Sequence, residues 1–200
     1  MVKKHFVVGP LGTNCYLIAD EEAGAACFVD PGDDAAKLIA YIEQSGYKLE
    51  YILLTHAHHD HTGALDALTE RWDVPVYLHK ADAEAKVAGL FYQGKKATTP
   101  VEDGDELALG SIKIKVISTP GHSEGSCVYM VENDLYTGDT LFAGSCGRVD
   151  FPGGNAEKMM ASLKKLSELE GDYNVYPGHM NFSTMERERM TNYYMRSGRI

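Results

Sequence analysis

One seven-residue segment constrains the fold of this chain more than any other. It reads Thr55-His56-Ala57-His58-His59-Asp60-His61. It follows a short apolar run, 51–54, that is typical of a buried strand. Residues at i and i+2 of an extended turn point the same way, so His56 and His58 can hold one ion. If a helix begins near Asp60, Asp60 and His61 turn toward a second ion. Imidazole and carboxylate groups are the ligands that zinc or iron prefers, so the segment predicts a metal site at a strand end.

Three further segments each place one ligand-type residue beside a glycine, just beyond a predicted strand. They are Pro120-Gly121-His122, Gly138-Asp139 and Pro177-Gly178-His179. Glycine allows another part of the backbone to approach closely. A single Gly-His pair is weak evidence, because an isolated histidine is more often structural. Three glycine–ligand pairs, two with His and one with Asp and all at strand exits, indicate that His122, Asp139 and His179 join the same site.

Hydrophobic periodicity predicts the elements that carry these segments. Short apolar runs at 6–8, 15–18 and 26–29 predict an antiparallel meander, and the helical spacing over 33–45 predicts a helix capped by Asp33 or Asp34. The other expected strands are 51–54, 74–78, two within 106–118, 126–131, 135–137 and 173–176, and the other expected helices are 62–72, one from about 81, 156–169 and one opened by a capping box at 183–186. This order predicts an α+β fold of mixed sheets whose outer faces are covered by helices.

Length and composition narrow the class of protein. No linker or repeat divides the 200 residues, so one domain over 1–200 is expected. The net charge of −10 argues against partners such as nucleic acid or a membrane surface. No stretch approaches the roughly 20 apolar residues of a membrane span. The four cysteines form no C-x-x-C pair, and no apolar signal region follows the N-terminus, so a cytoplasmic protein is expected.

The chain resembles the metallo-β-lactamase superfamily, and within it the short glyoxalase II-like hydrolases. The resemblance rests on 29–32, 55–61, 119–123, 137–142 and 177–179, and so covers essentially the whole chain. It implies a four-layer αβ/βα sandwich with the metal site at one edge, between the two sheets.

The same resemblance implies a site for two divalent metal ions. One ion would be held by His56, His58 and His122, the other by Asp60, His61 and His179, with Asp139 bridging the two. Zinc is the expected ion, with iron or manganese as alternatives. A metal-bound hydroxide would attack a carbonyl carbon, because bound water has a pKa near 7, and Asp60 would also orient this nucleophile. Asp30 and Thr55 are candidates for orienting the imidazoles.

The substrate class depends on the segment Gly147-Arg148-Val149-Asp150-Phe151. Similar stretches occur in small glyoxalase II-like proteins and in persulfide dioxygenases. Arg148 stands where long-form glyoxalases II carry a glutathione-binding lysine, so it either binds a glutathione carboxylate or pairs with Asp150. The long forms also have a C-terminal helical domain, whereas one helix is expected here after His179.

These observations predict a metal-dependent hydrolase acting on a small-molecule thioester, possibly one linked to glutathione. The alternative is an iron-dependent persulfide dioxygenase that uses a single iron with His56, His122 and Asp139. A non-catalytic module would show lost ligands, and none is lost. Three other residues receive structural interpretations: His59 points away from the ions, His79 is structural, and the Cys146 thiol is packed rather than nucleophilic.

Overall fold

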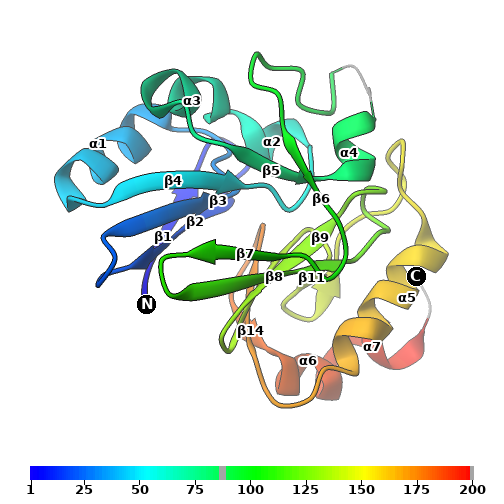
Figure 1. The fold of residues 1–200 in the computed structure, drawn as a ribbon. Helices are drawn as coiled ribbons and strands as arrows, with labels where there is room; N and C mark the ends of the chain where they lie inside the picture. The colour runs from blue at the N-terminus through cyan, green and yellow to red at the C-terminus, as the bar shows by residue number, and fades with distance from the viewer. Residues whose placement is uncertain (86–88, 199–200) are drawn as a thin grey trace.

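The computed structural model describes residues 1–85 and 89–198 and shows two six-stranded sheets with helices on both outer sides (Figure 1). The first sheet contains, in spatial order, β1 (Val2–Val8), β2 (Thr13–Asp20), β3 (Ala25–Val29), β4 (Lys48–Leu53), β5 (Val76–His79) and β6 (Thr99–Val101). The second contains β14 (Ser183–Thr184), β13 (Asn174–Pro177), β10 (Asp134–Gly138), β9 (Cys127–Val131), β8 (Ile112–Ser118) and β7 (Glu106–Leu109). A small hairpin joins β11 (Leu141–Phe142) to β12 (Ser145–Cys146).

Helices cover the outer face of each sheet. Those of the first half are α1 (Ala35–Ser45), α2 (His59–Thr62), α3 (Leu65–Trp72) and α4 (Lys80–Glu84). Those of the second half are α5 (Ala156–Ser167), α6 (Met185–Thr191) and α7 (Tyr193–Ser197). Within the described ranges, no helix has both the length and the apolar character that crossing a bilayer requires.

Three separate apolar clusters define the four layers. Leu38 and Leu65 of α1 and α3 pack on the outer face of the first sheet, against residues such as Ile52. Ile18 and Tyr129 belong to a second cluster, which lies between the two sheets. The third cluster joins the second sheet to α5 and is built from Ile117, Val128, Leu135, Leu141, Met159, Leu163, Leu166, Val175 and Met185. The predicted α+β four-layer sandwich is therefore confirmed.

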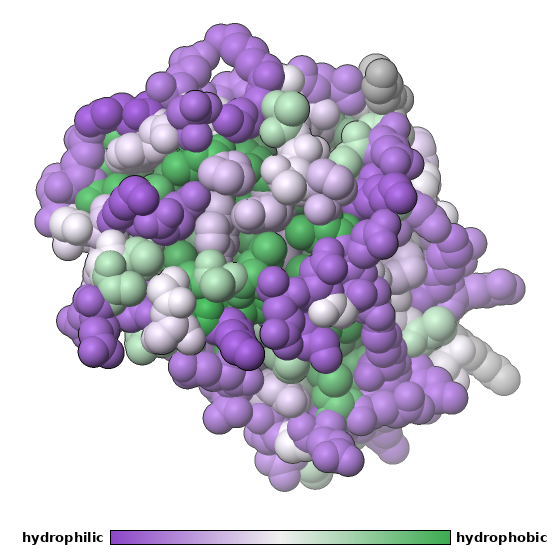
Figure 2. Space-filling model, in the orientation of Figure 1, coloured by the Kyte–Doolittle hydropathy of each residue, from purple (hydrophilic) through white to green (hydrophobic). Residues whose placement is uncertain are grey.

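The surface reflects this layering. On the face shown in Figure 2, hydrophobic residues are visible along the seam between the upper and the lower half of the molecule, and hydrophilic residues cover the rim and the outer helices. Strand β8 alternates in burial because successive side chains of a strand point to opposite faces of the sheet. Its residues Ile112, Ile114 and Val116 are buried, whereas Lys113 and Lys115 are exposed to solvent.

Local contacts move several predicted element ends. The helix expected over 62–72 is two helices, because Gly63 and Ala64 donate their N–H groups to the carbonyls of Gly32 and Pro31 instead of continuing the turn. Asp34 stands at the N-cap of α1, but its side chain makes no cap bond.

The predicted capping box at 183–186 is shifted by one residue. Thr184 caps α6 by accepting a hydrogen bond from the N–H of Arg187, while the Ser183 hydroxyl bonds to Glu188 instead.

Strand direction brings the important loops to one edge of the sandwich. β8 and β10 are both antiparallel to β9, so they point the same way, and β13 is parallel to β10. The carboxyl ends of these three strands therefore lie at the same edge of the second sheet. Backbone bonds join this edge to the first sheet: Cys127 donates to the carbonyl of Thr55 at 2.8 Å, and Asn14 donates to that of Gly178 at 2.7 Å.

Candidate metal centre

All seven predicted ligand residues converge at this edge. His56 and His58 lie in the loop after β4, and Asp60 and His61 lie on α2, which follows directly. His122, Asp139 and His179 follow β8, β10 and β13, and so come from the opposite sheet. The side chains form three overlapping groups, each with its ligand atoms within 4.8 Å of one another. The groups are His56, His58 and His122; His56, His61 and Asp139; and Asp60, His61 and His179.

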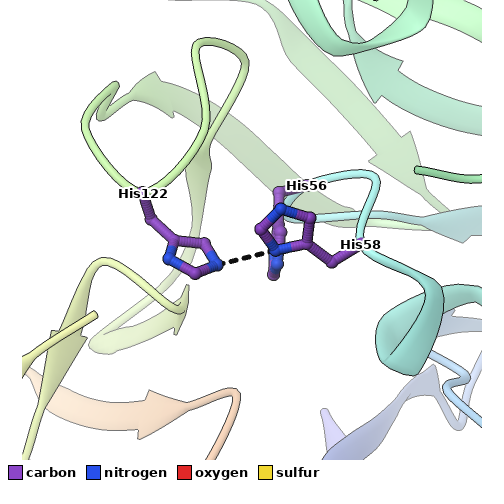
Figure 3. Close-up of side chains that lie close together, drawn as sticks. All are labelled: His56, His58 and His122. Carbon is purple, nitrogen blue, oxygen red and sulfur yellow. Dashed lines mark hydrogen bonds between the residues drawn. The ribbon is translucent and has the colours of Figure 1, made fainter. Parts of the chain in front are cut away.

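The first group consists of three imidazoles from two loops. Their rings gather around a common point in Figure 3, with His122 facing His58 across the gap between the loops. Nε2 of His122 lies 2.8 Å from Nδ1 of His58, and all three side chains are buried.

Asp139 lies between the group of His56, His58 and His122 and the group of Asp60, His61 and His179. One carboxylate oxygen, Oδ1, is 3.4 Å from Nε2 of His61. The other, Oδ2, is 3.5 Å from Nε2 of His122 and 3.7 Å from Nε2 of His179. This carboxylate thus faces residues of both predicted ion positions, as a bridging ligand must.

Four buried atoms in this cluster test whether its residues suit a metal. Nε2 of His56, His58 and His61 and Oδ1 of Asp139 are all inaccessible to solvent and have no hydrogen-bond partner among the described residues. A buried polar atom without a partner is costly, and such atoms are rare in folded proteins. Four such atoms lie in this one cluster. They are nitrogen and oxygen atoms of the kind that bind divalent ions, and a bound ion would give them the partner that they lack. The residues present therefore fit a metal centre.

The electrostatics favour the ligating protonation states of His56, His58 and Asp60, but not those of His61 and His179. Burial opposes protonation of these two imidazoles, yet the nearby carboxylates of Asp139, Asp30 and Asp60 outweigh it and raise the pKa of both. Burial, followed by repulsion from His122 and His61, lowers the pKa of His58 to about 3. Burial also lowers the pKa of His56 well below its usual range, with His61 adding to the effect. Burial opposes ionisation of Asp60, but its hydrogen bond with His179 outweighs this and lowers its pKa. Neutral imidazoles and ionised carboxylates are the forms that bind metal ions.

Asp30 and Thr55 do orient imidazoles, as expected. Oδ2 of Asp30 lies 3.0 Å from Nδ1 of His61 and accepts a hydrogen bond from the Thr55 hydroxyl at 2.7 Å. The same hydroxyl oxygen is 3.1 Å from Nδ1 of His56. These contacts fix both rings with their Nε2 atoms free for a ligand, the usual arrangement around metal-binding histidines.

Asp82 is a further supporting residue that sequence reasoning missed. Its buried carboxylate accepts hydrogen bonds from Ala57 N at 3.0 Å, the Ser123 hydroxyl at 2.8 Å and Gly125 N at 2.6 Å. Ala57 lies between two predicted ligands, and Ser123 directly follows a third, His122. Asp82 therefore ties together the two loops that form the first group. Its partners lie 25 to 43 residues away along the chain, so no local motif signals this role.

Close packing against two ligand side chains explains why residue 178 is a glycine. A Cβ atom at Gly178 would lie 2.5 Å from Oδ1 of Asp139 and 2.6 Å from Cε1 of His61. Real Cβ atoms do not approach other atoms so closely, so any larger residue would displace the cluster.

The cluster opens into a hollow of about 430 Å³. Its lining residues are Leu11, His58, His59, Asp60, Leu90, His122, Asp139, Phe142, Arg148, Phe151 and His179. Arg148 lines the hollow, and its side chain is largely exposed to solvent. Nε and Nη2 of its guanidinium each lie 2.7 Å from a carboxylate oxygen of Asp150, and the group stacks 3.8 Å from the ring centre of Phe151. The structure thus shows the internal ion pair, one of the two expected arrangements.

The residues given structural interpretations fall outside the metal-binding groups. His59 is exposed and belongs to none of them, although it lines the hollow. His79 caps α4 by accepting from Ala81 N, and its Nε2 contacts the Ser118 hydroxyl at 2.9 Å. Burial raises the pKa of the Cys146 thiol to about 11, which disfavours the nucleophilic thiolate.

Comparison with known families gives one broad match. The sequence model of the metallo-beta-lactamase superfamily matches residues 8–179. A probable metallo-hydrolase of Bacillus subtilis, YqgX, is 41% identical over 187 residues, covering 86% of this chain and 87% of the relative. A hydroxyacylglutathione hydrolase of Nitrosomonas eutropha is 40% identical over 156 residues, covering 77% of this chain but 56% of that protein.

Solved structures agree with this result. BLEG-1, described as a B3 metallo-beta-lactamase, superposes with a TM-score of 0.87 at 32% identity, covering 98% of this chain and 100% of its own. ETHE1 from Myxococcus xanthus gives 0.85 at 29% identity, covering 98% and 85%. TTHA1623, solved in a di-iron-bound form, gives 0.85 at 35% identity, covering 96% and 100%.

Proposed function

This chain belongs to the metallo-beta-lactamase superfamily, and we propose that it is a metal-dependent hydrolase that cleaves acyl thioesters. The observation that carries the proposal is the set of four buried, unpartnered ligand atoms beside an open hollow. Support for a thioester comes from the hydroxyacylglutathione hydrolase that is 40% identical over 156 residues.

The lining of the hollow supports water as the nucleophile. Among the described residues, no Ser, Cys, Lys or Tyr side chain lines it, so a covalent intermediate on such a group has no candidate. His56, His58 and His122 would hold one divalent ion, Asp60, His61 and His179 the other, and Asp139 would serve both. Such ions supply Lewis acidity, which lowers the pKa of water and polarises a carbonyl oxygen.

The protein's own groups orient the reactants. Asp60 is only partly buried and faces the hollow, so its carboxylate can accept a hydrogen bond from the attacking water and direct the water toward the carbonyl carbon. Water adds to that carbon, the carbon–sulfur bond breaks, and the products are a carboxylic acid and a thiol. Because a thiol has a pKa of about 8.5, the leaving thiolate needs little help from a general acid.

Hydrolysis of a panel of acyl thioesters, followed by thiol release, tests this function. Purified protein should turn over at least one thioester, and His58→Ala should lose both this activity and bound metal, because a ligand of the first group is gone. His59→Ala is the matched control: the neighbouring exposed imidazole is outside every metal-binding group, so its removal should leave the metal content unchanged. Failure of every thioester would refute the proposal.

The second candidate is an iron-dependent persulfide dioxygenase. It is favoured by the likeness to ETHE1 and by the segment Gly147-Arg148-Val149-Asp150-Phe151. Metal analysis of protein purified without added metal, together with oxygen consumption on glutathione persulfide, separates the two candidates. Two zinc ions and no oxygen uptake favour hydrolysis, whereas one iron with oxygen uptake favours the dioxygenase.

A further inference from the structure

Two hollows lie beside the metal-binding cluster. The first, of about 430 Å³, contains the ligand residues described above. The second, of about 420 Å³, is lined by Val8, Gly9, Pro10, Leu11, Thr13, Gly32, Asp33, His59, Asp60 and Gly63. Both hollows are lined by Leu11, His59 and Asp60. A thioester has two arms, one on each side of the reacting carbonyl, and two hollows that share Asp60 as a lining residue suit such a substrate.

Apart from His59 and Arg148, the walls of the first hollow beyond the ligands are apolar. Leu90, Phe142 and Phe151 line it together with Leu11, a residue that is 59% exposed and also lines the second hollow. An exposed apolar wall beside a polar centre is the usual setting of a small-molecule site, and it gains free energy when an apolar group covers it. The hollow therefore favours a substrate with an apolar arm.

Outside the metal-binding cluster, the described residues that line these hollows offer a substrate carboxylate no unpaired Lys or Arg. Among the described residues, Arg148 is the only Lys or Arg that lines either hollow. Asp150 binds it through two contacts of 2.7 Å, and the Phe151 ring covers one face of the guanidinium. The second hollow adds an exposed carboxylate, Asp33. A substrate carboxylate that lies away from the metal-binding cluster would therefore meet either an arginine that is already paired or a like charge.

We propose that the preferred substrate of this enzyme is a thioester with an apolar acyl group and a thiol arm that carries no carboxylate. This inference rests on the proposed thioester hydrolysis and narrows its substrate class. Glutathione carries two carboxylates and is disfavoured as the thiol arm. The Arg148–Asp150 pair is the specificity element, because it withholds the one guanidinium that a carboxylate would bind.

Paired probes measure this preference. Acyl thioesters of N-acetylcysteamine are uncharged, whereas S-lactoylglutathione carries the anionic tripeptide. The kcat/KM of the holoenzyme should be roughly tenfold or more higher for the hexanoyl N-acetylcysteamine thioester, a difference of about 1.4 kcal/mol. From the acetyl to the hexanoyl thioester, kcat/KM should rise by roughly fourfold for each added methylene. Phe142→Ala should reduce this gain, because it removes part of the apolar wall.

Asp150→Asn tests the specificity element directly. Freed of its partner, Arg148 can bind a substrate carboxylate, so the kcat/KM for S-lactoylglutathione relative to the hexanoyl thioester should rise by roughly fivefold, the size of one exposed ion pair. Glu43→Gln is a matched control, since Glu43, on α1, also pairs with an exposed arginine, Arg71, at 2.9 Å but lines neither hollow. This control should leave the ratio unchanged.

The outcomes of these experiments separate the inferred substrate preference from the proposed thioester hydrolysis. Equal or better turnover of S-lactoylglutathione by the unaltered enzyme would overturn the substrate inference while leaving thioester hydrolysis intact. An unchanged ratio in Asp150→Asn would show that the ion pair does not set specificity. Absence of turnover with every thioester would refute the proposed function, and the substrate inference with it.

Discussion

Replacing Asp82 by alanine should destabilise the protein even when no metal is bound. The substitution removes the acceptor of two buried backbone N–H groups, those of Ala57 and Gly125. The Ser123 hydroxyl loses less, because it remains 2.8 Å from the Ser126 hydroxyl. An unsatisfied buried donor costs about 1–3 kcal/mol, and the relief of no longer burying a carboxyl group offsets part of the sum. We expect a net loss of about 3 kcal/mol, or a decrease in Tm of roughly 6–12 °C for a chain of this size.

Thermal unfolding of chelator-treated protein measures this loss without any contribution from bound ions. A competition titration with a chromophoric chelator then measures zinc affinity. Because Asp82 ties together the loops of His56, His58 and His122, the variant should bind zinc 10- to 100-fold more weakly, the usual effect of removing a group that orients metal ligands. Asp82→Asn keeps one acceptor oxygen and should lie between the two proteins in both measurements.

Asp66→Ala is a matched control for these measurements. Asp66 also accepts two hydrogen bonds, from the Tyr92 hydroxyl at 2.7 Å and from Lys95 N at 3.1 Å, but it does not contact the ligand loops. Its removal should lower Tm modestly and leave zinc affinity unchanged. An unaltered Tm in Asp82→Ala would refute the hydrogen-bond argument. A lowered Tm with unaltered zinc affinity would show that Asp82 supports the fold but does not position the ligands.

Three other substitutions test separate parts of the structure. Gly178→Ala places a methyl group 2.5 Å from Oδ1 of Asp139, so metal analysis should find fewer than two ions per chain; full occupancy would contradict the packing argument. Hydrogen bonds from the Ser111 N–H and hydroxyl lower the pKa of Asp20 to about 2. The stability from this depressed pKa is present above the unfolded value of about 3.9 and is lost as pH falls toward 2, so Ser111→Ala should destabilise the protein at pH 6 more than at pH 2 in denaturant titrations. Leu163→Ala, which leaves a cavity under α5, should cost about 2–5 kcal/mol in the same assay with no change in metal content.

Local pattern was enough to predict the elements that carry the site. Strand runs such as 26–29 and the ligand pairs beside Gly121 and Gly178 depend on nearest neighbours in sequence, and the structure brings these segments to one edge. The break between α2 and α3 was not predictable in this way. It depends on the carbonyls of Pro31 and Gly32, which accept hydrogen bonds from Gly63 and Ala64 only once the fold has formed.

The role of Asp82 and the partner of Arg148 could not be predicted from the sequence, because both depend on contacts that form only in the folded chain. The role of Asp82 depends on partners in two distant loops, and a buried Asp in a short helix has no motif of its own. For Arg148, the sequence allowed either an ion pair with Asp150 or a glutathione contact. The structure shows the ion pair, because the turn after β12 places the two side chains within 2.7 Å.

The ligands are drawn from both halves of the sandwich. His56, His58, Asp60 and His61 come from the first sheet and its helix, whereas His122, Asp139 and His179 come from the second. Any ion held by members of both sets is thus a non-covalent cross-link between the two halves, and its binding free energy adds to the cohesion of the native state. Ion loss should therefore loosen the seam between the sheets first, so chelation should accelerate amide hydrogen exchange in β4 and β10 before the outer helices respond.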